Sequence, residues 1–426
     1  MLLFPVGHFT IKRGTSLNPC RIRHTIIFIV LISIYASWSA PGGDLQSWSR
    51  DEIDMLRSLW IGSLEAPPLD PTNVYSGNEK AARLGKKLFF DTRFSGNRKV
   101  SCGTCHNPGY SFTDRTPLAH GMGKGTRRTM TLIGVAFNPR FFWDGRKDSL
   151  WSQALGPIES EREHGFSRTR SVLTLLKFYR KEYEEVFGKA PPIDVENIPP
   201  GARPWGDNPA GLKSWALLGI EVQEKVNRIY VNMGKAIASY VRTIQPGPAP
   251  FDRYVEALIM GDTKGMQESM SQRAVAGLKL FIGKAQCVNC HNGPLFTNWD
   301  FHNLGLPPGI GLHPDEGRAR GIREVLQDEF NCFGRFSDGD ENRCAEIRYM
   351  DTSTDRFVGS FKTPTLRNVS KRAPFMHDGR FSSIRRLLEF YRSSKSTELH
   401  HGNLSDRELE EIESFLEALS GPVKSL

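Results

Sequence analysis

Two short stretches decide how this chain is built: residues 102–106 read Cys-Gly-Thr-Cys-His, and residues 287–291 read Cys-Val-Asn-Cys-His. Each places a histidine directly after a pair of cysteines three positions apart, which is the attachment signature of a c-type haem. Two thioether bonds leave one turn of backbone, and the adjacent imidazole faces the iron. A redox dithiol or half of a zinc site would not explain a histidine after both pairs. The sequence therefore predicts two covalently attached haems, held by Cys102, Cys105, His106, Cys287, Cys290 and His291.

The start of the chain is typical of an exported protein. Four cations precede an apolar run at residues 26–35, namely Lys12, Arg13, Arg21 and Arg23. The run ends in ASWSA at residues 36–40, and this layout indicates a secretory signal. An uncleaved anchor is the alternative, but the run is about half of the roughly 20 residues that a spanning helix needs. We predict a signal peptide over residues 1–39 and a periplasmic protein, in agreement with the oxidising compartment that haem attachment requires.

The net charge does not indicate a nucleic-acid partner. The 426 residues include 56 basic and 47 acidic side chains, which gives +9. Removal of the signal leaves 9 − 4 = +5, and two propionates on each haem offset four more charges, which leaves about +1. With 39% apolar residues, a chain of this length should form two hydrophobic cores. A disordered chain and a polytopic membrane protein are excluded.

Similar sequence surrounds both attachment sites and predicts an internal duplication. Residues 142–146 (FWDGR) follow the first site and residues 375–380 (FMHDGR) the second, where the interval is longer. The second unit must therefore carry an insertion, which we place around residues 325–345. It contains Cys332 and Cys344, and we expect these two cysteines to form a disulfide across a surface loop.

The apolar periodicity is helical, and no convincing run of alternating strand residues appears, so the predicted class is mostly α. Expected helices cover residues 171–187, 226–244, 267–281 and 382–391, with a last helix that Ser405 and Glu408 cap together. An irregular loop is expected at 188–211 and a proline-rich hinge at 245–250. We predict an N-terminal haem domain over residues 40–250 and a C-terminal haem domain over residues 251–426.

The two units offer different groups to their irons. Met376 could be the sixth ligand of the second haem, with His377 as its competitor; a thioether would raise the potential and close the iron to substrate. The first unit instead offers a carboxylate and an amide, which beside an open iron could move protons and stabilise charge during peroxide cleavage. Periodicity alone does not separate Glu163 from Glu159 and Glu161. The candidates in this unit are His120, Trp143, Gln153, Pro157 and Glu163.

With these motifs the chain resembles the bacterial dihaem cytochrome c peroxidase family, which also includes the methylamine-utilisation enzyme MauG. The resemblance covers nearly the whole mature chain. It is carried by residues 89–95 (FFDTRFS), 136–146 (AFNPRFFWDGR), 153–158 (QALGPI) and 361–368 (FKTPTLRN). It implies a low-potential peroxidatic haem in the N-terminal unit and a high-potential electron-storing haem in the C-terminal unit.

The resemblance also implies roles for individual residues. The family's inter-haem tryptophan corresponds to Trp143, its distal glutamine to Gln153, its pocket proline to Pro157 and its acid–base glutamate to Glu163. His120 corresponds in position to a histidine that, in many members, caps the peroxidatic iron in the fully oxidised enzyme.

The chain departs from the family pattern in two places. Members read Asn-Pro-x-Glu-Met around the catalytic glutamate, where this chain has charged neighbours and His164. Members also bind calcium between the haems through an asparagine that follows an arginine, where this chain reads Arg127-Arg128. The resemblance therefore implies a calcium ion, but the sequence does not identify the residues that would bind it. At Met376, MauG has a tyrosine, so the methionine favours a peroxidase.

We therefore expect an enzyme that reduces hydrogen peroxide to water in the periplasm. Its electrons would come from a small soluble donor, either a monohaem cytochrome c or a cupredoxin. Members of the family are often homodimers, an arrangement that this chain could share. Two alternatives are a MauG-like oxidase that acts on a partner protein and a dihaem electron carrier without catalysis.

Overall fold

Helices carry almost all of the regular structure. The computed structural model describes residues 48–308, 313–396, 398–399 and 403–426. The predicted signal peptide, with Cys20, lies outside the described residues. None of the helices in the described ranges combines the length and the apolar character that a membrane crossing requires. The predicted mostly α class is confirmed.

The described helices are α1 (Arg50–Leu59), α2 (Glu79–Phe90), α3 (Cys102–Cys105), α4 (Leu150–Glu159), α5 (Arg168–Phe187), α6 (Pro209–Ala216), α7 (Ile220–Val241), α8 (Pro250–Met260), α9 (Thr263–Ser269), α10 (Gln272–Ile282), α11 (Arg318–Gln327), α12 (Ala345–Arg348), α13 (Ile384–Ser393) and α14 (Asp406–Glu417). Short 3-10 turns and irregular loops connect them. The strands are β1 (Gln245–Pro246), β2 (Phe301–His302), β3 (Phe361–Lys362) and β4 (Val423–Lys424).

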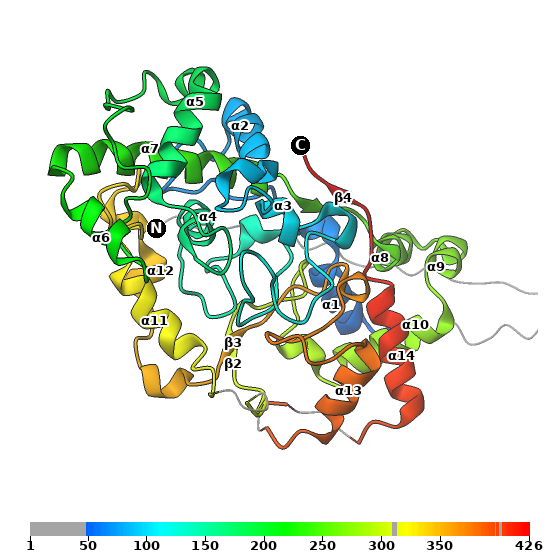
Figure 1. Ribbon diagram of the computed structural model, residues 1–426. Helices are drawn as coiled ribbons and strands as arrows, with labels where there is room; N and C mark the ends of the chain where they lie inside the picture. The colour runs from blue at the N-terminus through cyan, green and yellow to red at the C-terminus, as the bar shows by residue number, and fades with distance from the viewer. Residues whose placement is uncertain (1–47, 309–312, 397, 400–402) are drawn as a thin grey trace, which may run out of the picture. The chain divides into compact units, whose positions relative to one another are not determined.

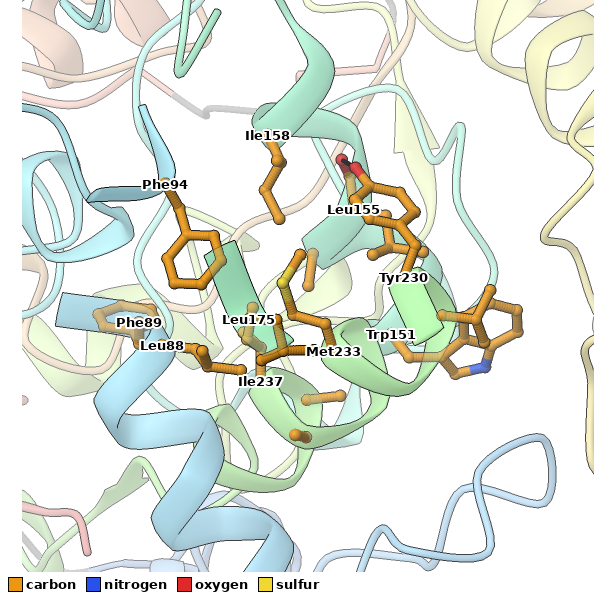
Figure 2. Packing of buried hydrophobic residues seen from close by; sticks show 14 of the residues in the cluster. Leu88, Phe89, Phe94, Trp151, Leu155, Ile158, Leu175, Tyr230, Met233 and Ile237 are labelled. Carbon is orange, nitrogen blue, oxygen red and sulfur yellow. Dashed lines mark hydrogen bonds between the residues drawn. The ribbon is translucent and has the colours of Figure 1, made fainter. Parts of the chain in front are cut away.

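The first group of helices is arranged around α7, which is buried almost continuously from Val226 onward. Helices α2, α4 and α5 pack against it (Figure 1). A Cβ atom on Gly85 of α2 would lie 1.9 Å from the carbonyl oxygen of Ala236, so glycine is required for the close crossing of α2 and α7. Figure 2 shows the resulting core, with Leu88, Phe89, Trp151, Leu155, Leu175, Tyr230, Met233 and Ile237.

The second group of helices is built in the same way around α10 and α14. A Cβ atom on Gly277 of α10 would lie 1.8 Å from the carbonyl oxygen of Glu411 in α14. Helix α14 begins with a capping box in which Ser405 and Glu408 each bind the other's backbone N–H, as predicted. Aromatic rings fill the core of this group, namely Phe251, Phe281, Phe296 and Phe415.

One expected helix is wrong in its extent. The periodicity predicted a single helix over residues 267–281, but the structure has two, α9 and α10. The break occurs because the Ser271 hydroxyl accepts a hydrogen bond from the Ala274 N–H at 3.2 Å and starts a new helix there. Met270 between them is extended and buried, so its apolar side chain keeps the periodic pattern without a continuous helix.

The predicted hinge is bound to the end of the chain. Its first two residues form β1, which pairs antiparallel with β4 so that Gln245 lies opposite Lys424. The other pair, β2 with β3, places Phe301 opposite Lys362. Ser49–Leu426 form one compact unit. The division into two haem domains near residue 250 stays a prediction.

The predicted insertion packs against the first group of helices. The disulfide between Cys332 and Cys344 is present, and both sulfur-bearing residues are buried beside Val325 and Ile347. The side chains of Phe330 and Phe336 join the core around α7. The Lys235 ammonium, buried in α7, lies 2.7 Å from an Asp338 carboxylate oxygen and donates to the Phe336 carbonyl. A segment from the second half of the sequence thus completes the core of the first.

Replacing Lys235 with alanine should destabilise the protein by about 2–3 kcal/mol. A fully buried ion pair loses about 3–5 kcal/mol when one partner is removed, and here Asp338 retains some contact with water. Lys225 is a matched control on the same helix, because its pair with Glu221 is largely exposed; Lys225→Ala should change stability by under about 0.5 kcal/mol. The free energies of unfolding from denaturant titration of the holoprotein give the comparison. Equal losses in the two variants would show that Lys235 does not hold the insertion in place.

Candidate active site

A cavity of about 1690 Å³ brings the two attachment motifs into one site. Its wall includes residues of both motifs and the predicted residues Trp143, Gln153, Pro157, Glu163 and Met376. Cys102 packs against the core just behind the wall. Residues that are far apart in the sequence are therefore placed around a common space large enough for cofactors.

Both motif histidines are held in the orientation that a metal ligand needs. The Nδ1 atom of His106 lies 3.2 Å from the Phe112 carbonyl oxygen, and that of His291 lies 3.0 Å from the Phe296 carbonyl oxygen. A carbonyl only accepts hydrogen bonds, so Nδ1 carries the proton and Nε2 keeps a free lone pair. Burial lowers the pKa of His106 and lowers that of His291 to about 4, which keeps both rings neutral. The arrangement fits proximal ligation of two irons.

The four motif cysteines are free and do not pair with one another. Burial raises the pKa of Cys102 to about 12, of Cys105 to about 11 and of Cys287 to about 12, so these thiols stay protonated at neutral pH. A redox dithiol is instead typified by a lowered pKa. In the described part of the chain, no three His, Cys, Asp or Glu side chains converge as a metal site would require. The described residues thus give no support to a redox dithiol or to a zinc site at these cysteines.

Two loops on the cavity wall, residues 141–147 after the first attachment site and residues 375–381 after the second, have matching backbone geometry. Phe141 bridges to Lys147 in the first loop, as Phe375 does to Phe381 in the second. Positive φ angles occur at matching places, with Phe142 at 66° and Met376 at 72°. In each loop an Asp-Gly-Arg turn follows, whose aspartate pairs with its arginine.

Phe142 therefore stands in the first loop where Met376 stands in the second. Both side chains line the cavity. A thioether can bind iron, but a phenyl ring cannot. The two matched loops thus differ in whether they carry a side chain that could bind iron.

The predicted catalytic residues of the first unit come from α4 and the segment after it. Ser149 caps α4, which carries Gln153 and Pro157 on the cavity wall. The Glu163 side chain is half-buried in the same wall, and no side chain or N–H in the described ranges donates a hydrogen bond to its carboxylate. Burial raises the pKa of Glu163, although the positive charge of Arg146 opposes the shift. A carboxyl group with a raised pKa is suited to proton transfer.

The comparisons with known proteins agree with this geometry. The family model for di-haem cytochrome c peroxidase matches residues 79–258. MauG of Methylorubrum extorquens is 32% identical over 83% of this chain and 80% of its own length. The chain belongs to the di-haem cytochrome c peroxidase family. Cytochrome-c peroxidase IdrP1 of a Pseudomonas species is 30% identical over 83% of this chain and 85% of its own.

Known structures of the family share the fold. The diheme peroxidase BthA from Burkholderia thailandensis matches 83% of this chain and 89% of its own chain with a TM-score of 0.61 and 21% sequence identity. Several relatives are named as cytochrome c peroxidases, including the cytochrome c551 peroxidase of Pseudomonas aeruginosa at 30% identity. This di-haem protein is thus an enzyme of the peroxidase class, with two c-type haems.

Trp143 lies in the cavity wall and contacts residues from both halves of the sequence. Its buried indole donates from Nε1 to the Arg128 carbonyl at 2.8 Å, and its own carbonyl accepts from the Lys362 N–H at 2.8 Å. The His377 ring contacts the indole edge-on and stacks on Phe361 with ring centroids 3.6 Å apart. The His377 imidazole is thus packed against rings from both halves of the sequence.

His120 does not lie with the other candidates. Its side chain is exposed on the glycine-rich loop and is not part of the cavity wall. This loop is hydrogen-bonded to the segment that carries Glu163. The Met122 N–H donates to the Glu163 carbonyl, and the Gly123 N–H donates to the Arg162 carbonyl. Ligation of iron by His120 stays a prediction and would require this loop to move.

Two buried cations of the wall were not found by sequence reasoning. Lys362 and Arg372 are nearly inaccessible, and no carboxylate in the described ranges lies within ion-pair distance of either. Burial lowers the pKa of Lys362 to about 8 and that of Arg372 to about 9. Buried charges need counter-charges, and haem propionates would supply them. No periodicity in residues 361–372 distinguishes these cations from Lys371, which is exposed.

The residues at Arg127-Arg128 do not fit a calcium ion. The Arg127 guanidinium pairs with Asp144 and Asp315. That of Arg128 donates to backbone carbonyl oxygens, which are the ligands a calcium ion would need here. The two arginines thus supply positive charge at this position themselves.

Replacing Lys362 with methionine should lower the midpoint potential of a haem. A nearby cation favours the ferrous form, which carries one positive charge less than the ferric form, so its loss stabilises the ferric state. An interaction of about 1.4 kcal/mol corresponds to about 60 mV for one electron. Potentiometric titration of the visible spectrum measures the shift, and Lys371→Met is the exposed control. Unchanged potentials in Lys362→Met would show that this ammonium does not face a haem.

Proposed function

We propose that this protein reduces hydrogen peroxide to water in the periplasm, with electrons delivered singly by a small cytochrome c or cupredoxin. The observation that carries the proposal is the pair Phe142 and Met376. Two loops of one backbone conformation offer a sulfur ligand to one haem and an apolar ring to the other. One haem is thereby suited to store an electron and the other to bind a small oxidant.

The reaction takes up two electrons and two protons for each peroxide and releases two water molecules. The haems, when bound, supply the iron that receives peroxide and the second reducing equivalent. Glu163 takes the proton from one peroxide oxygen and returns it to the oxygen that leaves as water. The Gln153 amide donates a hydrogen bond where negative charge develops. Pro157 shapes the pocket beside them.

Trp143 is proposed as the relay between the two haem sites. Its indole is buried, fixed through Nε1, and in contact with His377, which directly follows the proposed ligand Met376. His120 is proposed as a ligand of the first iron in the fully oxidised enzyme only. In the conformation seen here its side chain is at the surface, so this role implies movement of residues 119–125.

We also propose that the two haem units arose by internal duplication. The matched loops with Phe142 and Met376 support it. So do the two close helix crossings, at Gly85 in α2 and at Gly277 in α10, each just before an attachment site.

A MauG-like oxidase that acts on a partner protein is the second candidate. The similarity to MauG of Methylorubrum extorquens, at 32% identity, favours it. Against it stands Met376, since the resemblance places a tyrosine at this position in MauG. A carrier without catalysis is disfavoured by Phe142, which provides no ligand to close the first iron.

Glu163→Gln should lower kcat for peroxide reduction by about 100-fold or more, because the amide cannot shuttle a proton. The visible spectra of both haems should stay unchanged. Glu161→Gln is the control, since Glu161 lies two positions earlier, is exposed and pairs with Arg203; its kcat should stay close to that of the wild type. Steady-state assays with a reduced donor give both values. Full activity in Glu163→Gln would remove Glu163 from the mechanism.

Met376→Leu should convert one haem from six-coordinate to a weaker or open ligation state and lower its potential, because it loses a thioether ligand. Electron paramagnetic resonance and the absorption band of iron–methionine ligation measure the change. His377→Phe should keep that band, since a phenyl ring can preserve the stack on Phe361. Absence of that band from the wild type, with a paramagnetic resonance spectrum that changes in His377→Phe and not in Met376→Leu, would make His377 the ligand.

A further inference from the structure

Arg128 lies at the point where the two halves of the chain meet. The residue is only 7% exposed. Its backbone N–H donates to the His377 carbonyl at 2.7 Å, and its backbone carbonyl accepts from the indole of Trp143 at 2.8 Å. The same residue thus contacts the proposed relay of the first unit and the residue beside the proposed ligand Met376 of the second.

The guanidinium of Arg128 is surrounded by backbone carbonyl groups. It donates to the carbonyl oxygens of Thr129 at 3.3 Å and of Asp114 at 3.4 Å, both in the first half, and to that of Arg372 in the second half. No carboxylate in the described ranges lies within ion-pair distance of it. Carbonyl oxygens that converge from two segments on one positive charge are the kind of ligand set that a hard cation such as Ca²⁺ takes.

The neighbouring Arg127 shows that this arrangement is specific to position 128. Arg127 makes an ordinary ion pair, with its Nε and Nη2 atoms each 2.7 Å from an oxygen of Asp315. Two adjacent arginines therefore serve different purposes. Arg127 neutralises carboxylates, whereas Arg128 binds the neutral oxygens that link the two halves.

We propose that the Arg128 guanidinium is a built-in cation that takes the place of a calcium ion at this junction, so that the enzyme needs no divalent cation to hold its two haem sites and Trp143 in register. A calcium ion would compete for the same oxygens. It would also meet the positive charges of Arg128 and Arg372. These two charges are close to each other: burial lowers the pKa of Arg372, and the charge of Arg128 lowers it further. The proposal depends on the two haems but not on peroxide as the substrate.

The test begins with the wild-type holoprotein. Elemental analysis after gel filtration should find far less than one calcium per chain. The visible and electron paramagnetic resonance spectra of the half-reduced state should not change with EGTA, or with Ca²⁺ added to about 1 mM, a concentration that fills even weak protein calcium sites. One tightly bound calcium per chain, or a half-reduced spectrum that EGTA alters, would overturn the proposal.

Variants then separate a replaced cation from a merely structural side chain. Arg128→Asn removes the charge and leaves the carbonyl oxygens with an added amide oxygen. Its half-reduced spectrum should change, and Ca²⁺ should restore it where Mg²⁺ does not. Arg128→Lys keeps the charge and should need no calcium. Arg162→Asn, on the exposed rim of the cavity, is the control and should match the wild type.

The outcomes of the variants are unambiguous. A spectral change in Arg128→Asn that calcium reverses supports the proposal. An Arg128→Asn spectrum identical to the wild type, or a change that calcium does not reverse, contradicts it. If Arg128→Asn does not fold, the calcium content and EGTA response of the wild type decide the matter.

Discussion

The hydrogen bonds between the motif imidazoles and the carbonyl groups of Phe112 and Phe296 are the constraint on which the site depends. They orient His106 and His291 with Nε2 free. Both acceptor carbonyls belong to residues with positive φ, so the backbone must turn sharply after each motif to offer them. The helices serve as the frame that holds these irregular segments in place.

Two loops of the cavity wall share their backbone geometry and differ in their side chains. The loops at Phe142 and at Met376 share their φ angles, their bridges and their Asp-Gly-Arg turns. Phe142 stands in the first loop where Met376 stands in the second, and only the thioether could bind an iron. Glu163, Gln153 and Pro157 line the same cavity as both loops.

Buried cations from the first half of the chain contact groups in the second half. Arg127 reaches Asp315, Arg128 reaches the Arg372 carbonyl, and Lys235 reaches Asp338 of the insertion. Each of these cations is largely buried and comes from the first half. Because a buried charge without a partner is costly, the pairs fix how the second half sits against the first. The Arg128 carbonyl also accepts the hydrogen bond from the Trp143 indole.

The sequence by itself determined the features that depend on local chemistry. The five residues of Cys-x-x-Cys-His are enough to predict covalent haem attachment, because the attachment depends only on their spacing. The mostly α class and the cap at Ser405 also follow from local patterns, while the helix expected over residues 267–281 proved to be two. Only the tertiary structure decided which side chains share the cavity: Lys362 and Arg372 as unpaired cations, Glu163 on the wall with its raised pKa, and His120 outside it. It also placed the insertion against α7 and the Arg128 guanidinium among carbonyl groups of both halves. Burial and long-range contact set these properties, and neither depends on a residue's neighbours in sequence.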